Sequence, residues 1–179
     1  PLAFRLGRVA YNIGNGDGQF SIWNTAWVAR ALGLDPWHVF DANIFYPHAG
    51  ALAYSEANLG SGALALPVYW ATGNPYAAHG FVVLLSFILR GVGAYYLIRY
   101  LTGDRLASWC AGVIFAFCPH VFAHLLHIQL LWIAGLPWSL LAFHRLVDQP
   151  TSGRAVALGL TMTAQLYLCA YYAVFLVLV

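Results

Sequence analysis

The sequence has no lysine, a single glutamate and few charged residues of any kind, with Asp, Glu and Arg together making up 8% of 179 residues. Soluble domains carry about 25% charged residues, so this composition excludes an ordinary water-exposed surface. Hydrophobic residues make up 61% of the chain, and its mean hydropathy is +0.70. One core in a chain of this length cannot hide so much apolar side chain. The composition therefore predicts an integral membrane protein.

Cysteine is also scarce, and basic residues never cluster. The three cysteines, Cys110, Cys118 and Cys169, lie inside apolar runs, where a buried thiol is the ordinary case and a disulfide framework is not. The formal net charge is +2 at pH 7, and without a basic run we predict no nucleic-acid partner. The chain starts without Met and stops within an apolar run, so we expect it to be a piece of a longer protein.

Turn signals and apolar runs divide the chain into two zones. Residues 1–75 are amphipathic and rich in Gly, Pro, Asn and Asp, whereas residues 76–179 are almost continuously apolar. Run lengths predict four membrane spans in the second zone, the last one truncated, at about 76–101, 106–120, 125–143 and 156–179. The predicted fold is all-α: a polytopic bundle of transmembrane helices preceded by an extracytoplasmic loop that carries amphipathic interfacial helices.

Arginine placement predicts the orientation. Arg99 and Arg105 flank one connection between spans, and Arg145 and Arg154 flank another that the span count places on the same side. The positive-inside rule makes that side cytoplasmic, so residues 1–75 face outwards. Arg5, Arg8 and Arg30 then lie on the outer side, but in a longer segment where the rule has less force.

Residues 20–34 are predicted to form a helix lying in the membrane surface. Phe20, Trp23, Trp27, Ala31 and Leu34 recur at helical spacing, and Gly33 with Asp35-Pro36 would end the helix. An ordered loop at 37–49 follows. Ser55 is then predicted to cap a second short helix that carries Glu56 and breaks near Gly60-Ser61-Gly62 and Pro67.

Asp17 is the first acidic residue and stands on a glycine-rich segment, Gly14-Asn15-Gly16-Asp17-Gly18, ahead of the Trp-rich helix. An Asp just before a helix is a standard N-cap, and the three glycines suit a plain turn. A calcium loop fits less well, because no Glu follows at EF-hand spacing. A carboxylate held here could also touch both water and lipid, where a base acting on a lipid-linked substrate is needed.

Three short motifs resemble one superfamily. Gly16-Asp17-Gly18, the run 40–47 (Phe-Asp-Ala-Asn-Ile-Phe-Tyr-Pro) and His127-Ile128-Gln129 are similar to uncharacterised bacterial members of the GT-C superfamily, membrane glycosyltransferases that use polyprenyl-phosphate sugars. The resemblance implies an inverting transfer of a sugar from a polyprenyl-phosphate donor to an extracytoplasmic glycan, lipid or protein acceptor. It also implies a multi-pass protein of the bacterial cytoplasmic (inner) membrane, in contact with membrane lipids.

By this resemblance Asp17 corresponds to the catalytic base of the first outer loop, which would take the proton of the attacking acceptor hydroxyl. Many relatives carry a second acidic residue nearby, and Gln19 stands at the Asp-x-Asp position here. Glu56, on the same outer face, is the second catalytic candidate, against the alternative of a solvated surface Glu. The predicted substrate-binding residues are Asp41, Asn43, Tyr46, His48, His124, His127, Gln129 and Arg90. For Asp41 and Asn43, building the loop is an equal alternative.

Three histidines, His120, His124 and His127, are spaced so that one continuous helix would point them the same way. Such a face could bind a phosphate or a metal, although imidazoles are the only evident ligands. The pattern lacks the Glu of a zinc peptidase, because Val121 stands in its place. We therefore predict no metal ligand set, and the sequence does not require a divalent metal as cofactor.

Arg90 lies within the first predicted span, where a charge is costly and therefore suggests a function. It could neutralise the phosphate of a lipid donor, or it could be a snorkelling or internally paired arginine. The rival to the whole interpretation is a non-catalytic membrane protein, such as a lipid or polysaccharide transporter subunit. In that case Asp17 would be an N-cap and the histidines would line a cavity.

Overall fold

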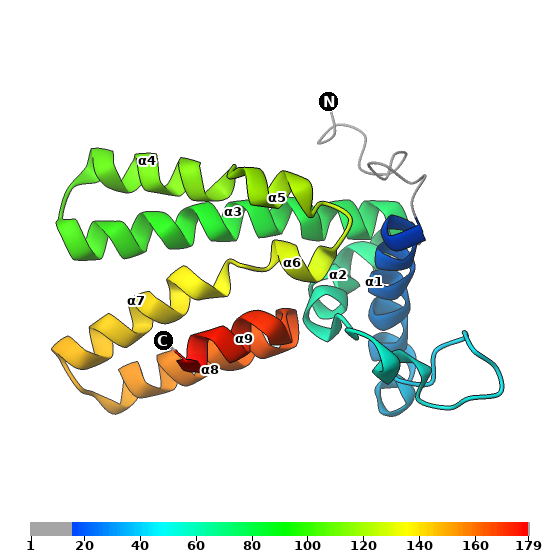
Figure 1. Cartoon of the computed structure of the whole chain (residues 1–179). Helices are drawn as coiled ribbons and strands as arrows, with labels where there is room; N and C mark the ends of the chain where they lie inside the picture. Colours follow the sequence, from blue (N-terminus) through cyan, green and yellow to red (C-terminus); the bar gives the residue numbers. More distant parts are fainter. Residues whose placement is uncertain (1–15, 179) are drawn as a thin grey trace. The chain divides into compact units, whose positions relative to one another are not determined.

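The structure of the protein is a computed structural model that describes residues 16–178. Within that range every regular element is a helix, which confirms the predicted all-α class. The elements are α1 (Gly16–Leu34), η2 (Pro36–His38), η3 (Ala51–Tyr54), α2 (Leu59–Thr72), α3 (Pro75–Thr102), α4 (Arg105–Ala116), α5 (Pro119–Ala123), α6 (Ile128–Leu131), α7 (Gly135–Asp148), α8 (Ser152–Leu168) and α9 (Ala170–Leu178) (Figure 1). They form two compact units, residues up to 84 with 125–129, and residues 85–124 with 130–179.

The first unit is built on the pair α1 and α2, which pack against each other. Gly62 of α2 makes this possible, because a Cβ there would fall 2.2 Å from Cγ1 of the buried Val28. The indole N–H of Trp70 donates to the carbonyl of Ala29 at 3.1 Å and fixes the pair further along. Val28 and Leu52 anchor the small core beneath.

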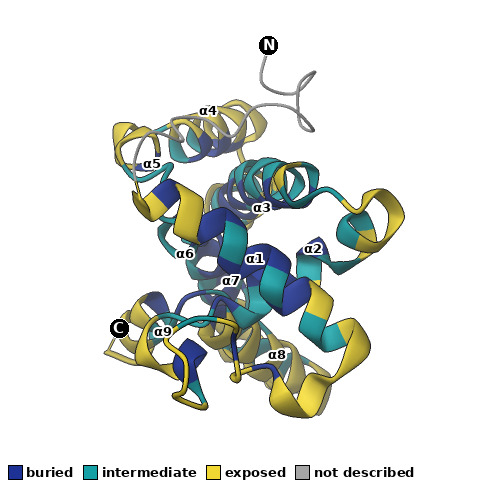
Figure 2. Cartoon of the chain, turned by 90° about the vertical axis from the view of Figure 1, so that its right-hand side faces the viewer, coloured by how far each residue is buried: buried dark blue, intermediate teal, exposed yellow. Residues whose placement is uncertain are grey.

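Helix α1 begins at Gly16, four residues before the predicted start, so Asp17 lies within its first turn. The N-cap interpretation of Asp17 is therefore wrong, because the cap position precedes the first helical residue. The helix ends at Leu34, as the following Asp35-Pro36 predicts. Figure 2 shows α1 exposed at both ends and buried through its middle.

The loop after α1 is closed by backbone contacts. The Asp41 carboxylate accepts from the backbone N–H of Gly50 at 2.7 Å, and the N–H of Leu52 donates to the carbonyl of Phe40 at 3.0 Å. The prediction for the next helix is wrong in two respects. Ser55 ends η3 instead of capping α2, and α2 starts after Asn58 and runs unbroken to Thr72.

In the second unit, glycines let helices approach closely. A Cβ on Gly112 of α4 would lie 2.8 Å from the Gly91 carbonyl oxygen of α3, and one on Gly93 would lie 2.8 Å from the Trp138 indole of α7. That indole N–H donates to the carbonyl of Leu89 at 2.9 Å. Helices α7, α8 and α9 pack on one another.

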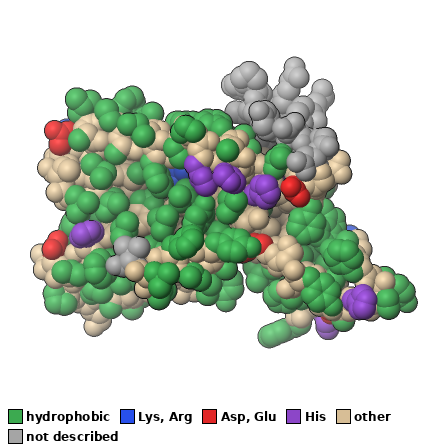
Figure 3. Space-filling model, in the orientation of Figure 1, with side chains coloured by type: hydrophobic (Ala, Val, Ile, Leu, Met, Phe, Trp, Pro, Cys, Tyr) green, Lys and Arg blue, Asp and Glu red, His purple; other side chains and the backbone are tan. Residues whose placement is uncertain are grey.

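Three helical segments in the described range are long and apolar enough to cross a membrane: Pro75–Thr102, Arg105–Ala123 and Ile128–Asp148. They correspond to the first three predicted spans. The fourth predicted span is instead two helices, α8 and α9, separated at Cys169, whose backbone is extended. Many large apolar side chains stay exposed, among them Ile88, Leu106, Trp109 and Ile114. Hydrophobic side chains make up most of the face in Figure 3.

The two arginine-flanked connections lie at one end of the second unit. The Tyr100 hydroxyl, near the end of α3, donates to the Asp148 carboxylate at the end of α7. The Arg145 guanidinium lies 5.5 Å from the centre of the Tyr100 ring. This arrangement is the one that the predicted orientation needs, with both connections on the same side.

Candidate functional site

The side chains of Asp17 and His127 lie together in the first unit. His127 Nε2 is 3.6 Å from Asp17 Oδ2, and the two side chains are 41% and 63% exposed. Asp17 projects from the first turn of α1, and His127 from the turn just before α6. The resemblance pointed to both residues, and the structure places them side by side with access from solvent.

A ladder of polar contacts along α1 holds this pair in place. The hydroxyl of the buried Ser21, one turn after Asp17, accepts from the backbone N–H of Ile128 at 3.3 Å. Thr25, one turn further, donates to the Ser21 carbonyl at 2.8 Å and lies 3.5 Å from Nδ1 of the buried His79. Because Ile128 directly follows His127, the Ser21 contact holds the backbone beside His127 against α1.

Glu56 lies in the link before α2, and its backbone has a clear structural role. Its carbonyl accepts from Asn24 Nδ2 at 3.0 Å and from Asn58 Nδ2 at 3.3 Å. The side chain is half-buried. Asn24 is fully buried, and within residues 16–178 its Oδ1 accepts no hydrogen bond. The structure thus gives Asn24 and the Glu56 backbone a shared packing role.

The remaining substrate-binding candidates of the first unit do not gather in one place. Asp41 closes the loop through Gly50, as its loop-building alternative predicted. Asn43 accepts from the Trp23 indole at 3.3 Å. Tyr46 is 96% exposed, and His48 lines an apolar pocket of about 590 Å³ with Phe20 and Leu52. Gln129 is half-buried on α6, two residues after His127.

The predicted single face of three histidines is wrong. Helix α5 ends at Ala123, and α6 begins only at Ile128. In a continuous helix the N–H of Ile128 would bond to the carbonyl of His124, but here it bonds to Ser21 instead. His127 therefore belongs to the first unit, while His120 and His124 belong to the second. No group of three or more metal-ligating side chains occurs within residues 16–178.

His120 and His124 stack with ring centres 4.2 Å apart. His124 Nδ1 lies 2.7 Å from the carbonyl of His120, to which it donates. The hydroxyl of Tyr172 donates to the carbonyl of Leu130 at 3.2 Å, so it can only accept from His120 Nε2, also at 3.2 Å. These two contacts fix the protonated nitrogen of each ring.

Arg90 of α3 is fully buried in the second unit. Its guanidinium carbon lies 4.0 Å from the centre of the Phe87 ring, a cation–π contact. Within the described part of the chain, none of its three nitrogens has a hydrogen-bond partner. Because the guanidinium is buried, snorkelling to the membrane surface does not describe Arg90. A buried guanidinium in this condition is a strong site for an anion.

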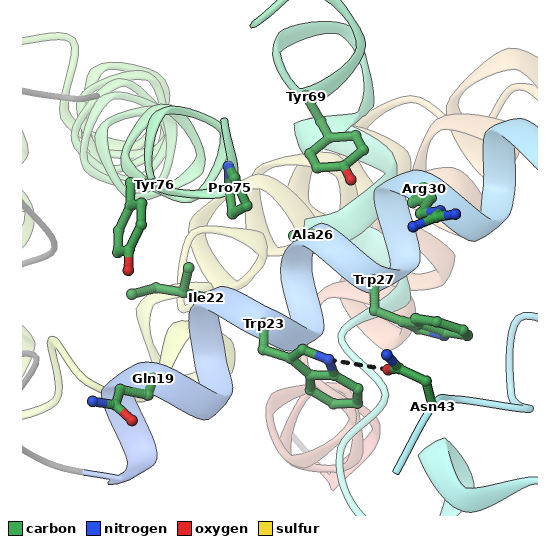
Figure 4. A pocket seen from close by; sticks show the side chains of 10 residues that line it. All are labelled: Gln19, Ile22, Trp23, Ala26, Trp27, Arg30, Asn43, Tyr69, Pro75 and Tyr76. Carbon is green, nitrogen blue, oxygen red and sulfur yellow. Dashed lines mark hydrogen bonds between the residues drawn. The ribbon is translucent and has the colours of Figure 1, made fainter. Parts of the chain in front are cut away.

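An aromatic cleft of about 530 Å³ lies along another face of α1 (Figure 4). Trp23, Trp27 and Arg30 of α1 line one edge of the cleft, and Tyr69 of α2 and Tyr76 of α3 line the opposite edge, beyond α1. The remaining lining residues are Gln19, Ile22, Ala26, Asn43 and Pro75. Sequence reasoning assigned these tryptophans to the membrane surface, placed Arg30 off their stripe and missed the cleft, although at 3.6 residues per turn Trp23, Trp27 and Arg30 share one side of the helix.

Comparison with protein-family models, curated proteins and solved structures gave no match to this chain.

Proposed function

We propose that the protein is a membrane glycosyltransferase of the GT-C kind. It transfers a sugar from a polyprenyl-phosphate donor to an extracytoplasmic glycan, lipid or protein acceptor in the bacterial cytoplasmic membrane. Support comes from the motif resemblance, from three helices with the length and hydropathy of membrane spans, and from the site in the first unit.

The single observation that carries the proposal is the Asp17–His127 pair. Two residues from motifs more than 100 positions apart in the chain lie 3.6 Å apart, side by side and accessible. An N-cap or a plain turn residue has no need of that partner. An accessible carboxylate can instead act as a general base when a bound hydroxyl comes within hydrogen-bond distance of it.

The proposed reaction is a single inverting displacement. The acceptor hydroxyl oxygen attacks the anomeric carbon of the donor sugar while Asp17 takes the hydroxyl proton, so the nucleophile develops as the proton leaves. The bond between the anomeric carbon and the phosphate oxygen breaks on the opposite face. Polyprenyl phosphate leaves with the bonding electron pair, and His127 holds the Asp17 carboxylate in position.

For the donor, the second unit offers a buried cation. A desolvated guanidinium stabilises the negative charge of a lipid phosphate more strongly than one in water. Arg90, which within residues 16–178 has no hydrogen-bond acceptor, is the residue of the second unit to which we assign the binding of a lipid phosphate. The proposal requires no metal.

The test is a transfer assay on the full-length protein in native membranes or proteoliposomes, with a panel of radiolabelled polyprenyl-phosphate sugars. Asp17→Asn keeps the size of the side chain and removes its basicity, so we expect transfer to fall by about 10²-fold or more, as for loss of a general base. His127→Gln should lower transfer less, because it removes only the orienting partner.

The matched control is Asp35→Asn, the same exchange near the other end of α1, which should leave transfer unchanged. Chelator in a parallel reaction should also leave it unchanged. Full transfer by a folded Asp17→Asn protein would show that the base is wrong. Absence of transfer from every donor by the wild type would reject the enzyme and favour the transporter-subunit alternative.

A further inference from the structure

The two tryptophans of the aromatic cleft offer a ligand apolar ring surface, because their polar indole N–H groups bond within the protein. The indole N–H of Trp23 donates to Asn43 Oδ1 at 3.3 Å, and that of Trp27 donates to the carbonyl of Val39 at 2.9 Å. The two rings are nearly parallel, with centres 6.3 Å apart and an interplanar angle of 22°. With both N–H groups engaged within the protein, what remains for a ligand is an extended aromatic surface (Figure 4).

Polar groups stand beside this surface. Arg30 is exposed on the same face of α1, one turn beyond Trp27, and makes no ion pair within residues 16–178. Asn43 uses its carbonyl oxygen on Trp23 and keeps its amide N–H groups for an acceptor. Gln19 adds a second amide at the other end of the cleft, and Tyr76 lies across from it.

The cleft and Asp17 lie on different faces of α1. Asp17, Ser21 and Thr25 follow each other at intervals of four residues and share the face that contacts residues 127 and 128. At 3.6 residues per turn, Trp23, Trp27 and Arg30 lie roughly opposite. A ligand in the cleft is therefore held by side chains other than the proposed base.

We infer that this cleft binds a saccharide that carries a carboxylate, such as a uronic acid unit. Apolar C–H faces of a pyranose lie against aromatic rings, amides bond to its hydroxyls, and Arg30 pairs with the carboxylate in a two-pronged contact. A volume of about 530 Å³ is of the size of small-molecule sites, which span roughly 300–1,000 Å³. The inference goes beyond the proposed transfer, because it concerns binding and a separate face of α1.

The experiment is equilibrium binding by isothermal titration calorimetry on the full-length protein in detergent micelles. The probes are a tetrasaccharide of β-1,4-linked glucuronic acid and cellotetraose, which has the same linkage without carboxylates. We expect the acidic probe to bind about tenfold more tightly, because only its carboxylate can pair with the Arg30 guanidinium. Arg30→Gln should remove this preference, and Tyr76→Ala should weaken binding of both probes.

Trp37→Ala is the matched control, because Trp37 is 91% exposed in the same unit and does not line the cleft. It should leave both affinities unchanged. Absence of binding by either probe, or an acidic preference that survives Arg30→Gln, would overturn the inference. Displacement of the acidic probe by glycerol phosphate at equal concentration would also overturn it and assign the cleft to lipid headgroups.

The same titration separates this inference from the proposed transfer. Asp17→Asn should bind the acidic tetrasaccharide with wild-type affinity even though we expect it to lose transfer. If the wild type binds the acidic tetrasaccharide but transfers no sugar, the saccharide site is supported and the proposed transferase is rejected. If it transfers sugar but binds neither probe, the transferase is supported and the saccharide site is rejected.

Discussion

Replacing Arg90 by Met should stabilise the protein when no lipid phosphate is present. Arg90 is fully buried, and within residues 16–178 no acceptor reaches any of its guanidinium nitrogens. The effective desolvation penalty of a buried ion is several kcal/mol, and the Phe87 ring returns about 2 kcal/mol of it. Met fills a similar volume without charge, so we expect a gain of roughly 1–3 kcal/mol, within the range found for exchanging buried ions for apolar side chains.

The assay is reversible unfolding of the purified protein in mixed micelles by titration with SDS, followed by tryptophan fluorescence. Farnesyl phosphate and farnesol, which differ only in the phosphate, serve as ligands. At about 100 times its dissociation constant, farnesyl phosphate should stabilise the wild type by about 2.7 kcal/mol. It should not stabilise Arg90→Met, and farnesol should affect both proteins equally.

The control is Arg105→Met, at the exposed first residue of α4, which should change the free energy of unfolding by no more than about 0.5 kcal/mol. A ligand-free Arg90→Met protein less stable than wild type by about 1 kcal/mol or more would refute the reasoning. It would mean that the guanidinium is already paired in the folded protein. Equal stabilisation of both proteins by farnesyl phosphate would refute the assignment of Arg90 to the phosphate.

Three further predictions concern packing, buried hydrogen bonds and pH. Gly62→Ala should destabilise the first unit by about 1–3 kcal/mol in the same unfolding assay, because the new Cβ meets Val28 at 2.2 Å, whereas Gly159→Ala in α8, with open space around it, should be neutral or stabilising. Ser21→Ala should lower the free energy of unfolding by about 1–3 kcal/mol, because it leaves the buried N–H of Ile128 without an acceptor. Ser21→Thr keeps the hydroxyl and should lower the free energy of unfolding less. Equal losses in the two variants would contradict the role of the hydroxyl. The Asp35 carboxylate, 2.7 Å from His38, accepts a hydrogen bond from the imidazole and raises the pKa of His38 above 6.5. The stability that this exposed pair contributes is therefore complete below pH 6.5 and is lost as the pH rises through the raised pKa. An NMR titration in which Asp35→Asn leaves the pKa of His38 unchanged would contradict this.

Run length and composition were enough to predict the helical class and three membrane-length helices, because the cost of unpaired backbone groups in lipid leaves long apolar segments few alternatives. The local sequence pattern did not predict that the helix carrying the histidines breaks before His127. The helix after Pro119 ends at Ala123, and the N–H of Ile128 bonds to Ser21, a residue 107 positions earlier in the chain. The break at Cys169 has no Gly or Pro beside it, and no sequence signal marks it.

The buried face of α1 was also beyond a single-sequence argument. The usual rule turns the apolar stripe of a helix inwards, but α1 buries Ser21, Asn24 and Thr25 and leaves part of its aromatic stripe lining an open cleft. Small polar side chains with partners pack as closely as apolar ones. Only the partners, Ile128, Glu56 and His79, which lie elsewhere in the chain, decide which face of the helix is inside.

The buried polar side chains of α1, which lie among the buried Ile22, Ala26, Val28 and Ala29, give the helix a single rotational setting. Apolar contacts are non-directional and would tolerate a helix that turns slightly about its axis, but hydrogen bonds to Ile128 and Glu56 would break on a turn of one residue. The same rotation would carry Asp17 away from His127 and Trp27 away from the cleft. These small polar side chains therefore fix the rotation of α1 about its axis, so that one face of the helix holds Asp17 beside His127 and another face lines the cleft.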